Sequence, residues 1–170
     1  YSGDMASMRA LALLGDRKLE LTDLPPPPAP DDGQVQIRVR AVAHNHIDVW
    51  GYRGMALAKR QYPLVVGAEA AGEAVAVGAN VKNFKAGDPV VMYGALTCGV
   101  CRYCKEGRDN LCENVGGIMG FHVDGCACEL VNMQERLVIP VPKGVSMRDA
   151  ACVRSAPDSA EGRTRSPRAR

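Results

Sequence analysis

The sequence predicts a mainly β fold with short helices, on three observations. Apolar Val35, Ile37 and Val39 alternate with polar residues, which is the period of a half-buried strand. Glycine, proline and aspartate recur between apolar runs, as they do where tight turns join strands. Four cysteines within residues 98–112 indicate a metal-binding lobe. With 170 residues, 46% of them hydrophobic, we expect one globular core and not two full domains.

The expected elements follow in order along the chain. A hairpin with its turn at Gly15-Asp16 comes first, and the proline-rich residues 25–30 are interpreted as a surface connector. Pro140 and Pro142 end the strand pattern, and Ser146 is predicted to cap a helix that begins near Met147. The remaining predictions are strands at 8–14, 19–22, 35–40, 70–77, 90–93, 128–133 and 137–139, and a short helix at 45–51.

Both ends of the chain differ in composition from the middle. Residues 1–7 do not begin with Met and are interpreted as a leader or cloning remnant, which leaves 8–153 as the ordered domain. Residues 154–170 contain no Leu, Ile, Val, Met or aromatic side chain. Such a segment cannot offset its ordering entropy by burial, so we predict a disordered basic tail.

The charge and hydropathy pattern excludes several partner classes. The net charge is +2, and the tail alone contributes +3 (five Arg against Asp158 and Glu161), so the body carries −1. A near-neutral body argues against a nucleic-acid partner. No apolar run reaches the roughly 18 residues of a membrane span. Seven Cys without a visible secretory signal predict reduced thiols and a cytoplasmic location.

The cysteine cluster predicts one structural zinc ion. Cys98, Cys101 and Cys104 lie on one tight loop, and a polar, glycine-containing return brings Cys112 back to them. Four thiolates fill the tetrahedral shell of Zn²⁺ at Zn–S distances of about 2.3 Å and leave no position for water or substrate. An iron–sulfur cluster usually has other spacings, and a redox pair of Cys101 and Cys104 would leave two cysteines unexplained. Cys126, Cys128 and Cys152 are interpreted as small apolar residues.

Several further motifs then become recognisable in a fixed order. They are Val39–Asp48, Pro63–Gly72, Gly78–Val81, Phe84–Val90 and the cysteine lobe. With them the chain resembles the N-terminal, GroES-like domain of the medium-chain dehydrogenase/reductase superfamily over roughly residues 8–153. The resemblance implies a partly open β-barrel with short helices. It also implies a separate Rossmann domain for NAD(P)(H), which we take to be absent from this chain because no dinucleotide fingerprint is visible.

Zinc alcohol dehydrogenases of this superfamily hold a second, catalytic zinc, and here the sequence departs from them. Asn45 stands where the first catalytic Cys is expected, and Ala68 replaces the His before Glu69. An amide is a poor zinc ligand and alanine is none. The chain is therefore predicted to hold one zinc, without a catalytic one. The spacing of Asn45 and Asp48 is similar to the quinone oxidoreductase branch, which works without that metal.

The resemblance implies tentative catalytic roles for Asn45, His46, Asp48 and Glu69, inherited from the parent enzyme. Asn45 either hydrogen-bonds a substrate carbonyl or nicotinamide amide, or stabilises its loop. His46 reaches a cofactor phosphate, relays a proton, or is a surface residue. Asp48 holds the loop rather than acting as a base, and Glu69 supports the pocket or is structural.

Two functions of different class follow. The first is the N-terminal zinc-binding domain of an NAD(P)(H)-dependent oxidoreductase for a small-molecule substrate, inactive alone because the cofactor domain is missing. The second is a free-standing, zinc-stabilised binding module. Because the face toward the absent domain should be apolar, with Trp50, Met55 and Leu57 near it, self-association through that face is a further expectation.

Overall fold

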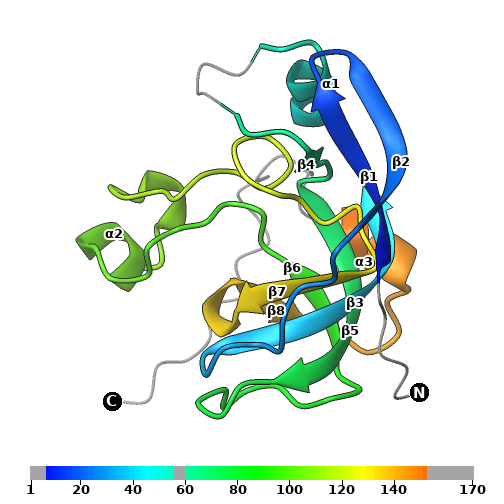
Figure 1. Ribbon diagram of the computed structural model, residues 1–170. Helices are drawn as coiled ribbons and strands as arrows, with labels where there is room; N and C mark the ends of the chain where they lie inside the picture. Colours follow the sequence, from blue (N-terminus) through cyan, green and yellow to red (C-terminus); the bar gives the residue numbers. More distant parts are fainter. Residues whose placement is uncertain (1–6, 56–59, 153–170) are drawn as a thin grey trace.

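The computed structural model describes residues 7–55 and 60–152, which form two antiparallel sheets (Figure 1). The smaller sheet has the order β2-β1-β4 and the larger one the order β7-β3-β5-β6-β8. The strands are β1 Met8–Gly15, β2 Lys18–Leu24, β3 Gln34–Ala43, β4 Leu64–Val65, β5 Glu69–Val77, β6 Pro89–Met92, β7 Leu130–Gln134 and β8 Val138–Pro140.

Helices are few and short. Three α-helices and two 3₁₀ turns occur in the described residues, namely α1 His46–Tyr52, α2 Arg102–Lys105, η1 Asp109–Leu111, η2 Glu135–Leu137 and α3 Met147–Cys152. Ser146 Oγ accepts a hydrogen bond from the Asp149 backbone N–H at 3.2 Å, as an N-cap does. The predicted helix near Met147 is therefore present, with the predicted cap.

The core lies on one face of the larger sheet. Val35 and Ile37 of β3 are fully buried, whereas Gln36 between them is half-buried and Arg38 after them is exposed, so the alternation in the sequence marks the buried face. β5 is buried on both faces. Ala70 and Ala74 belong to the main core, and Ala71 packs beneath α3.

The fold class expected from the sequence is confirmed: the chain is mainly β, and its curled sheets carry a separate four-cysteine lobe. Every predicted strand is present within a few residues of its predicted bounds. Four short elements were not predicted: β4, α2, η1 and η2. Each has two to four residues, too short for a periodic pattern to appear.

Some predictions concern residues that lie outside the described part of the structure. The predicted leader and the predicted basic tail coincide almost entirely with residues 1–6 and 153–170, which lie outside the described residues. Across residues 7–55 and 60–152, none of the helices has the length and apolar character needed to span a membrane.

Candidate metal centre and catalytic pocket

The four-cysteine lobe stands apart from both sheets, on the left of Figure 1. Cys101 is the N-cap residue of α2, Cys104 lies within α2, and Cys112 follows η1 directly. The two short helical turns therefore bring Cys112 back to the loop that begins at Cys98. All four side chains are partly buried.

The sulfur positions fit a closed zinc site. The four Sγ atoms lie within 4.8 Å of one another, and Cys98 Sγ is 4.0 Å from Cys104 Sγ. Tetrahedral zinc with Zn–S distances of about 2.3 Å needs sulfurs about 3.8 Å apart, so a small inward movement completes the shell. Among the described residues this is the one group of three or more His, Cys, Asp or Glu side chains close enough to hold a metal ion.

Backbone N–H groups donate hydrogen bonds to two of the four sulfurs. The Cys98 backbone N–H donates to Cys112 Sγ at 3.3 Å, and the Cys101 N–H donates to Cys98 Sγ at 3.3 Å. Hydrogen bonds from the backbone of Val100 and then of Cys101 lower the pKa of Cys98 to about 6, while burial raises the pKa of Cys104 to about 12. Four neighbouring thiolates repel one another, and a divalent cation offsets that repulsion.

The predicted catalytic residues begin at α1, where Asn45 and Asp48 form a capping box. Asn45 Oδ1 accepts from the Ile47 N–H at 2.9 Å, and Asp48 Oδ2 accepts from the Asn45 N–H at 2.9 Å. Asp48 Oδ1 also accepts from the Gly67 N–H at 3.1 Å. Both carboxylate oxygens of Asp48 thus bind backbone groups, which ties α1 to the segment before β5.

Glu69 meets Asn45 because β3 and β5 are paired there. Ala43 near the end of β3 lies opposite Glu69 at the start of β5, and the chain turns into α1 two residues later. Asn45 Nδ2 donates to Glu69 Oε1 at 3.0 Å. Glu69 Oε2 is buried without a hydrogen-bond partner, and the residue is only 9% exposed.

A cavity of about 250 Å³ opens beside this pair. Besides Asn45 and Glu69 its walls are small or apolar: Ile47, Ala68, Gly94, Ala95 and Ile118. A side chain on Gly94 would collide with the Ala68 carbonyl oxygen, because a Cβ built there comes within 2.1 Å of that atom. Gly94 therefore lets its backbone pack directly against the Ala68 carbonyl group on one side of the cavity.

His46 lies outside the hydrogen-bonded group of Asn45, Asp48 and Glu69. Its side chain is exposed, and its ring centroid is 6.3 Å from that of Trp50, one turn further along α1. The structure thus brings together three of the four residues with predicted catalytic roles. Their roles in catalysis stay predictions.

The expected apolar face is partly visible around α1. Trp50 is 47% exposed and Met55 58% exposed, and Val49 and Tyr52 are also exposed. Leu57, predicted to lie near them, is outside the described residues. What covers this face stays a prediction.

The residues at the position of a catalytic zinc do not fit that metal. Asn45 Oδ1 caps α1, Ala68 has no donor atom, and only Glu69 offers a carboxylate. Zinc sites of the catalytic type need three protein ligands and an open position. Cys152, interpreted from the sequence as a small apolar residue, is exposed at the end of α3.

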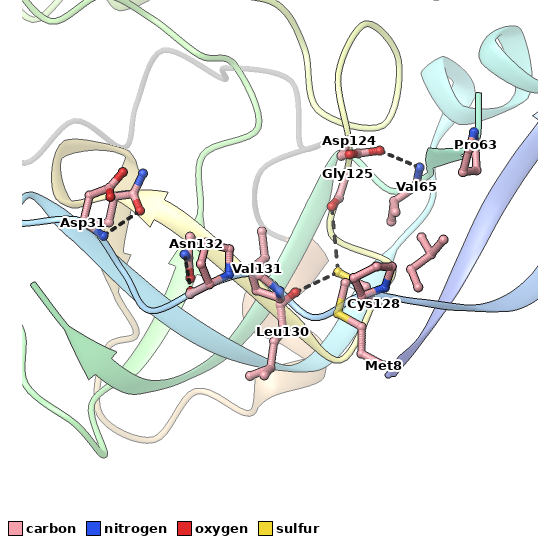
Figure 2. Close-up of a pocket in the computed structure, with 15 residues that line it drawn as sticks. Met8, Asp31, Pro63, Val65, Asp124, Gly125, Cys128, Leu130, Val131 and Asn132 are labelled. Atoms are coloured by element: carbon pink, nitrogen blue, oxygen red, sulfur yellow. Dashed lines mark hydrogen bonds between the residues drawn. The ribbon is translucent and has the colours of Figure 1, made fainter. Parts of the chain in front are cut away.

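A larger cavity of about 570 Å³ is unrelated to these residues (Figure 2). The proline-rich connector forms one wall, and β7 residues Leu130–Asn132 form another. Cys128 lies in it and donates to the Leu130 carbonyl oxygen at 3.2 Å; burial raises the pKa of this thiol to about 11. A thiol with a raised pKa is a poor nucleophile.

Sequence reasoning missed a second polar cluster behind α1. The Arg60 guanidinium, 4% exposed, donates to the Gly51 carbonyl oxygen at 2.7 Å and to Asp16 Oδ1 at 2.8 Å, and Tyr62 also donates to Asp16. His44 Nδ1 lies 3.7 Å from Asp48 Oδ2. Asp16 and Arg60 are 44 positions apart, so no local pattern links them.

Comparison with known proteins decides the family. Residues 31–143 match the alcohol dehydrogenase GroES-like domain. The chain belongs to this family. The expectation from the sequence motifs is thereby confirmed.

The relatives of this GroES-like domain are dehydrogenases. The chain is 34% identical over 149 residues to sorbitol dehydrogenase of Bacillus subtilis, covering 86% of this chain and 42% of that protein. It is 33% identical over 141 residues to L-threonine 3-dehydrogenase of Salmonella gallinarum, covering 82% and 41%. The chain therefore spans less than half the length of these relatives.

Solved structures show the same relationship. An NAD-dependent alcohol dehydrogenase has a TM-score of 0.77 at 41% identity, covering 85% of this chain and 42% of that one. A cobalt- and zinc-bound thermostable alcohol dehydrogenase from Pyrobaculum aerophilum has a TM-score of 0.76 at 32% identity, covering 85% and 44%.

Proposed function

We propose that this chain is the substrate-side part of an NAD(P)(H)-dependent oxidoreductase that transfers hydride without a catalytic zinc. One observation carries the proposal. The cavity beside Asn45 and Glu69 keeps polar groups for a substrate, while Ala68 and the capping amide of Asn45 leave no ligand set for a metal. The dehydrogenase relatives support the reaction class.

The proposed division of labour follows from the contacts. Asp48 fixes α1 through two backbone hydrogen bonds, so that Asn45 faces Glu69 across the cavity. Asn45 and Glu69 orient the substrate, and exposed His46 contacts the cofactor or passes a proton at the rim. The nicotinamide supplies or accepts the hydride when it is bound. One zinc in the cysteine lobe has a purely structural role.

The cofactor is proposed to bind to a part of the protein outside these 170 residues. Gly116, Gly117 and Gly120 form an irregular loop, and no α-helix follows it in the described residues before α3. The loop therefore lacks the helix N-terminus on which a pyrophosphate rests. We accordingly propose that the 170-residue chain alone does not turn over NADH or NADPH.

A chimera tests the enzymatic proposal. Residues 8–152 replace the matching N-terminal part of the NAD-dependent alcohol dehydrogenase that is 41% identical. We expect the chimera to oxidise NADH or NADPH with a small carbonyl substrate, or to run the reverse reaction, while it contains only the lobe zinc. The unmodified relative is the control. A folded chimera that binds NADH but turns over only after taking up a second zinc would contradict the proposal.

The alternative is a free-standing, zinc-stabilised binding module, and the exposed apolar residues of α1 and of the segment just after it favour this alternative. Val49, Trp50, Tyr52 and Met55 offer a surface for a partner or a second copy of the chain. Sedimentation of the isolated chain and its Trp50→Ser variant measures self-association. Titration with NADH and NADPH is a separate test, because tight cofactor binding by the chain alone would contradict the proposal that the cofactor binds outside these residues.

A further inference from the structure

The outer edge of β2 carries backbone groups that the sheet leaves unpaired. β2 is an edge strand of the smaller sheet and lies outside β1 on the right of Figure 1. In β1, the Leu11 N–H donates to the Ala127 carbonyl oxygen at 2.8 Å, and the Leu11 carbonyl oxygen accepts from the Val66 N–H at 3.0 Å. Leu11 thus points both groups away from β2, so its antiparallel partner Leu21 points both of its own groups away from β1.

Every second residue of β2 has the same orientation. Arg9 uses its backbone N–H and carbonyl oxygen to bind Glu129, so its partner Asp23 also faces away from β1. Leu19 follows by the two-residue period of a strand. The backbone N–H and carbonyl groups of Leu19, Leu21 and Asp23 therefore point outward. Within the part of the chain that the structure describes, no backbone hydrogen bond uses them.

The side chains along this edge continue an apolar face of the sheet. Leu19 lies opposite Leu13, and Leu21 lies opposite Leu11, so the four leucines share one face. Leu13 is fully buried in a cluster with Leu64, whereas Leu19 is 41% and Leu21 68% exposed. β2 places neither Pro nor Lys on this face, although such residues commonly prevent pairing at a free edge. An added strand would therefore extend both the hydrogen bonding and the apolar face.

A second copy of β2 fits the edge best in one antiparallel register. With Leu21 opposite its own copy, Leu19 lies opposite Asp23 of the other strand, and the three outward residues of each copy exchange both backbone bonds. A shift by two residues leaves one outward residue of each copy unpaired. In the direction of the turn that shift also places Glu20 directly opposite Glu20 of the other copy, which is unfavourable. The sequence of β2 is thus self-complementary.

Charge on the edge also suits a second copy. In this register Arg17 of one copy lies diagonally across from Asp23 of the other, with about 7–8 Å between their Cα atoms, a distance that an Arg side chain can span. Both residues are exposed. Neither forms an ion pair across residues 7–55 and 60–152. The dimer would therefore pair two charges of each copy that are unpaired within it.

We propose that β2 is a homodimer interface, in which two copies of this chain pair antiparallel with Leu21 at the two-fold axis and join their three-stranded sheets into one sheet of six strands. The pairing uses the β2 edge of both copies, so association through it stops at a dimer. Pro25 has no N–H and ends the ladder directly after Leu24. The inference does not depend on the proposed oxidoreductase activity. Its surface is also distinct from the exposed apolar residues of α1.

Amide hydrogen exchange tests the register. The zinc-loaded 170-residue chain is followed by NMR at about 50 µM and about 1 mM, and we expect a dissociation constant of about 100 µM for such a small interface. The amides of Leu19, Leu21 and Asp23 should then exchange about threefold more slowly at the higher concentration. Those of Glu20 and Thr22 already donate to β1 and should change much less. Concentration-independent exchange, or equal slowing at all five residues, would overturn the proposal.

Two substitutions at Leu21 sharpen the test. Leu21→Pro removes an N–H that the single chain does not use, and Leu21→Lys places a charge at the two-fold axis. We expect both variants to sediment as monomers of 18.2 kDa at about 1 mM, where the wild type is about 80% dimeric. The matched control is Ile139→Lys, an exposed apolar residue on β8, the edge strand of the larger sheet; it should remain dimeric.

Trp50→Ser separates this edge from the face around α1, and it should also leave the dimer intact. A wild-type chain that stays monomeric at about 1 mM would overturn the inference. A dimer that persists in folded Leu21→Lys, or that is lost in Trp50→Ser alone, would place the interface elsewhere and overturn it too. If Leu21→Pro does not fold, Leu21→Lys and the exchange pattern of the wild type decide the question.

Discussion

The cysteine lobe and the Asn45–Glu69 pocket belong to one domain but differ in their sets of possible metal ligands. In the lobe all four donors are present and their sulfurs lie within 4.8 Å of one another. In the pocket an amide and a methyl group stand where ligands would be, and one carboxylate remains. The lobe has little apolar core of its own, so we expect a bound zinc to stabilise its fold. The pocket sits on paired strands, so its chemistry can change while the fold persists.

The largest effect of a substitution is expected in the cysteine lobe. Cys112→Ser removes the ligand that closes the shell, and because structural zinc contributes about 10 kcal/mol or more of binding energy, we expect loss of zinc and of the local fold. Metal analysis of purified, reduced protein should fall from one zinc per chain to a small fraction, with new protease cleavage within residues 98–115. Cys152→Ser, outside the lobe, should retain one zinc. Full retention of zinc by Cys112→Ser would show that three thiolates suffice.

In the pocket, the test adds metal ligands instead of removing one. The double variant Asn45→Cys, Ala68→His supplies a thiolate and an imidazole next to Glu69, which makes three protein ligands of the catalytic type. We expect zinc content to rise from one to two per chain. The control Asn45→Ser, Ala68→Asn changes the same positions without adding good ligands and should stay at one. A folded double variant with one zinc would mean that the pocket geometry, and not only its ligands, has departed from a metal site.

We expect Asp48 to stabilise the fold whether or not it has a catalytic role. Asp48→Ala leaves the Asn45 and Gly67 N–H groups without their acceptor, which should lower the free energy of unfolding by about 2 kcal/mol. Urea denaturation of the zinc-loaded chain measures the change. Glu73→Gln, which loses an ion pair with Arg40 on a half-exposed surface, should cost about 0.5 kcal/mol or less. Similar values for the two variants would contradict the role given to Asp48.

A smaller effect than that of Asp48 is expected at Glu135, which lies in neither the ligand group of the lobe nor the lining of the pocket. Glu135 Oε1 accepts from the backbone N–H groups of Lys82 and Asn83, and the Asn83 bond first, then that of Lys82, lowers the pKa of Glu135. A lowered pKa in the folded state stabilises the protein above the unfolded pKa, and that stability is lost as the pH falls through the folded value. Glu135→Gln should therefore cost about 1 kcal/mol at pH 7 and less below pH 4. A cost independent of pH would show that the charge contributes nothing.

Local patterns predicted the parts of this molecule that are local. The cysteine spacing gave the ligand group, because three of its members lie within seven residues of one another. The Ser146 cap also depends on adjacent positions, and so does the hairpin turn, which lies at Asp16-Arg17, one residue further than predicted. The cavity could not be found in this way, since Ala68, Gly94 and Ile118 meet from three separate segments. That Glu69 Oε2 lacks a hydrogen-bond partner likewise results from packing, so it cannot be predicted from neighbouring positions in the sequence.

The buried guanidinium of Arg60 has a consequence for how substrate preference could drift. It joins the hairpin turn at Asp16 to the last turn of α1 at Gly51, although neither contact touches the cavity. We expect a substitution that removes either hydrogen bond to change the tilt of α1 and, with it, the position of Asn45. Changes at the other end of the helix could thus alter the pocket, and the first hairpin is a place to look for such distant positions.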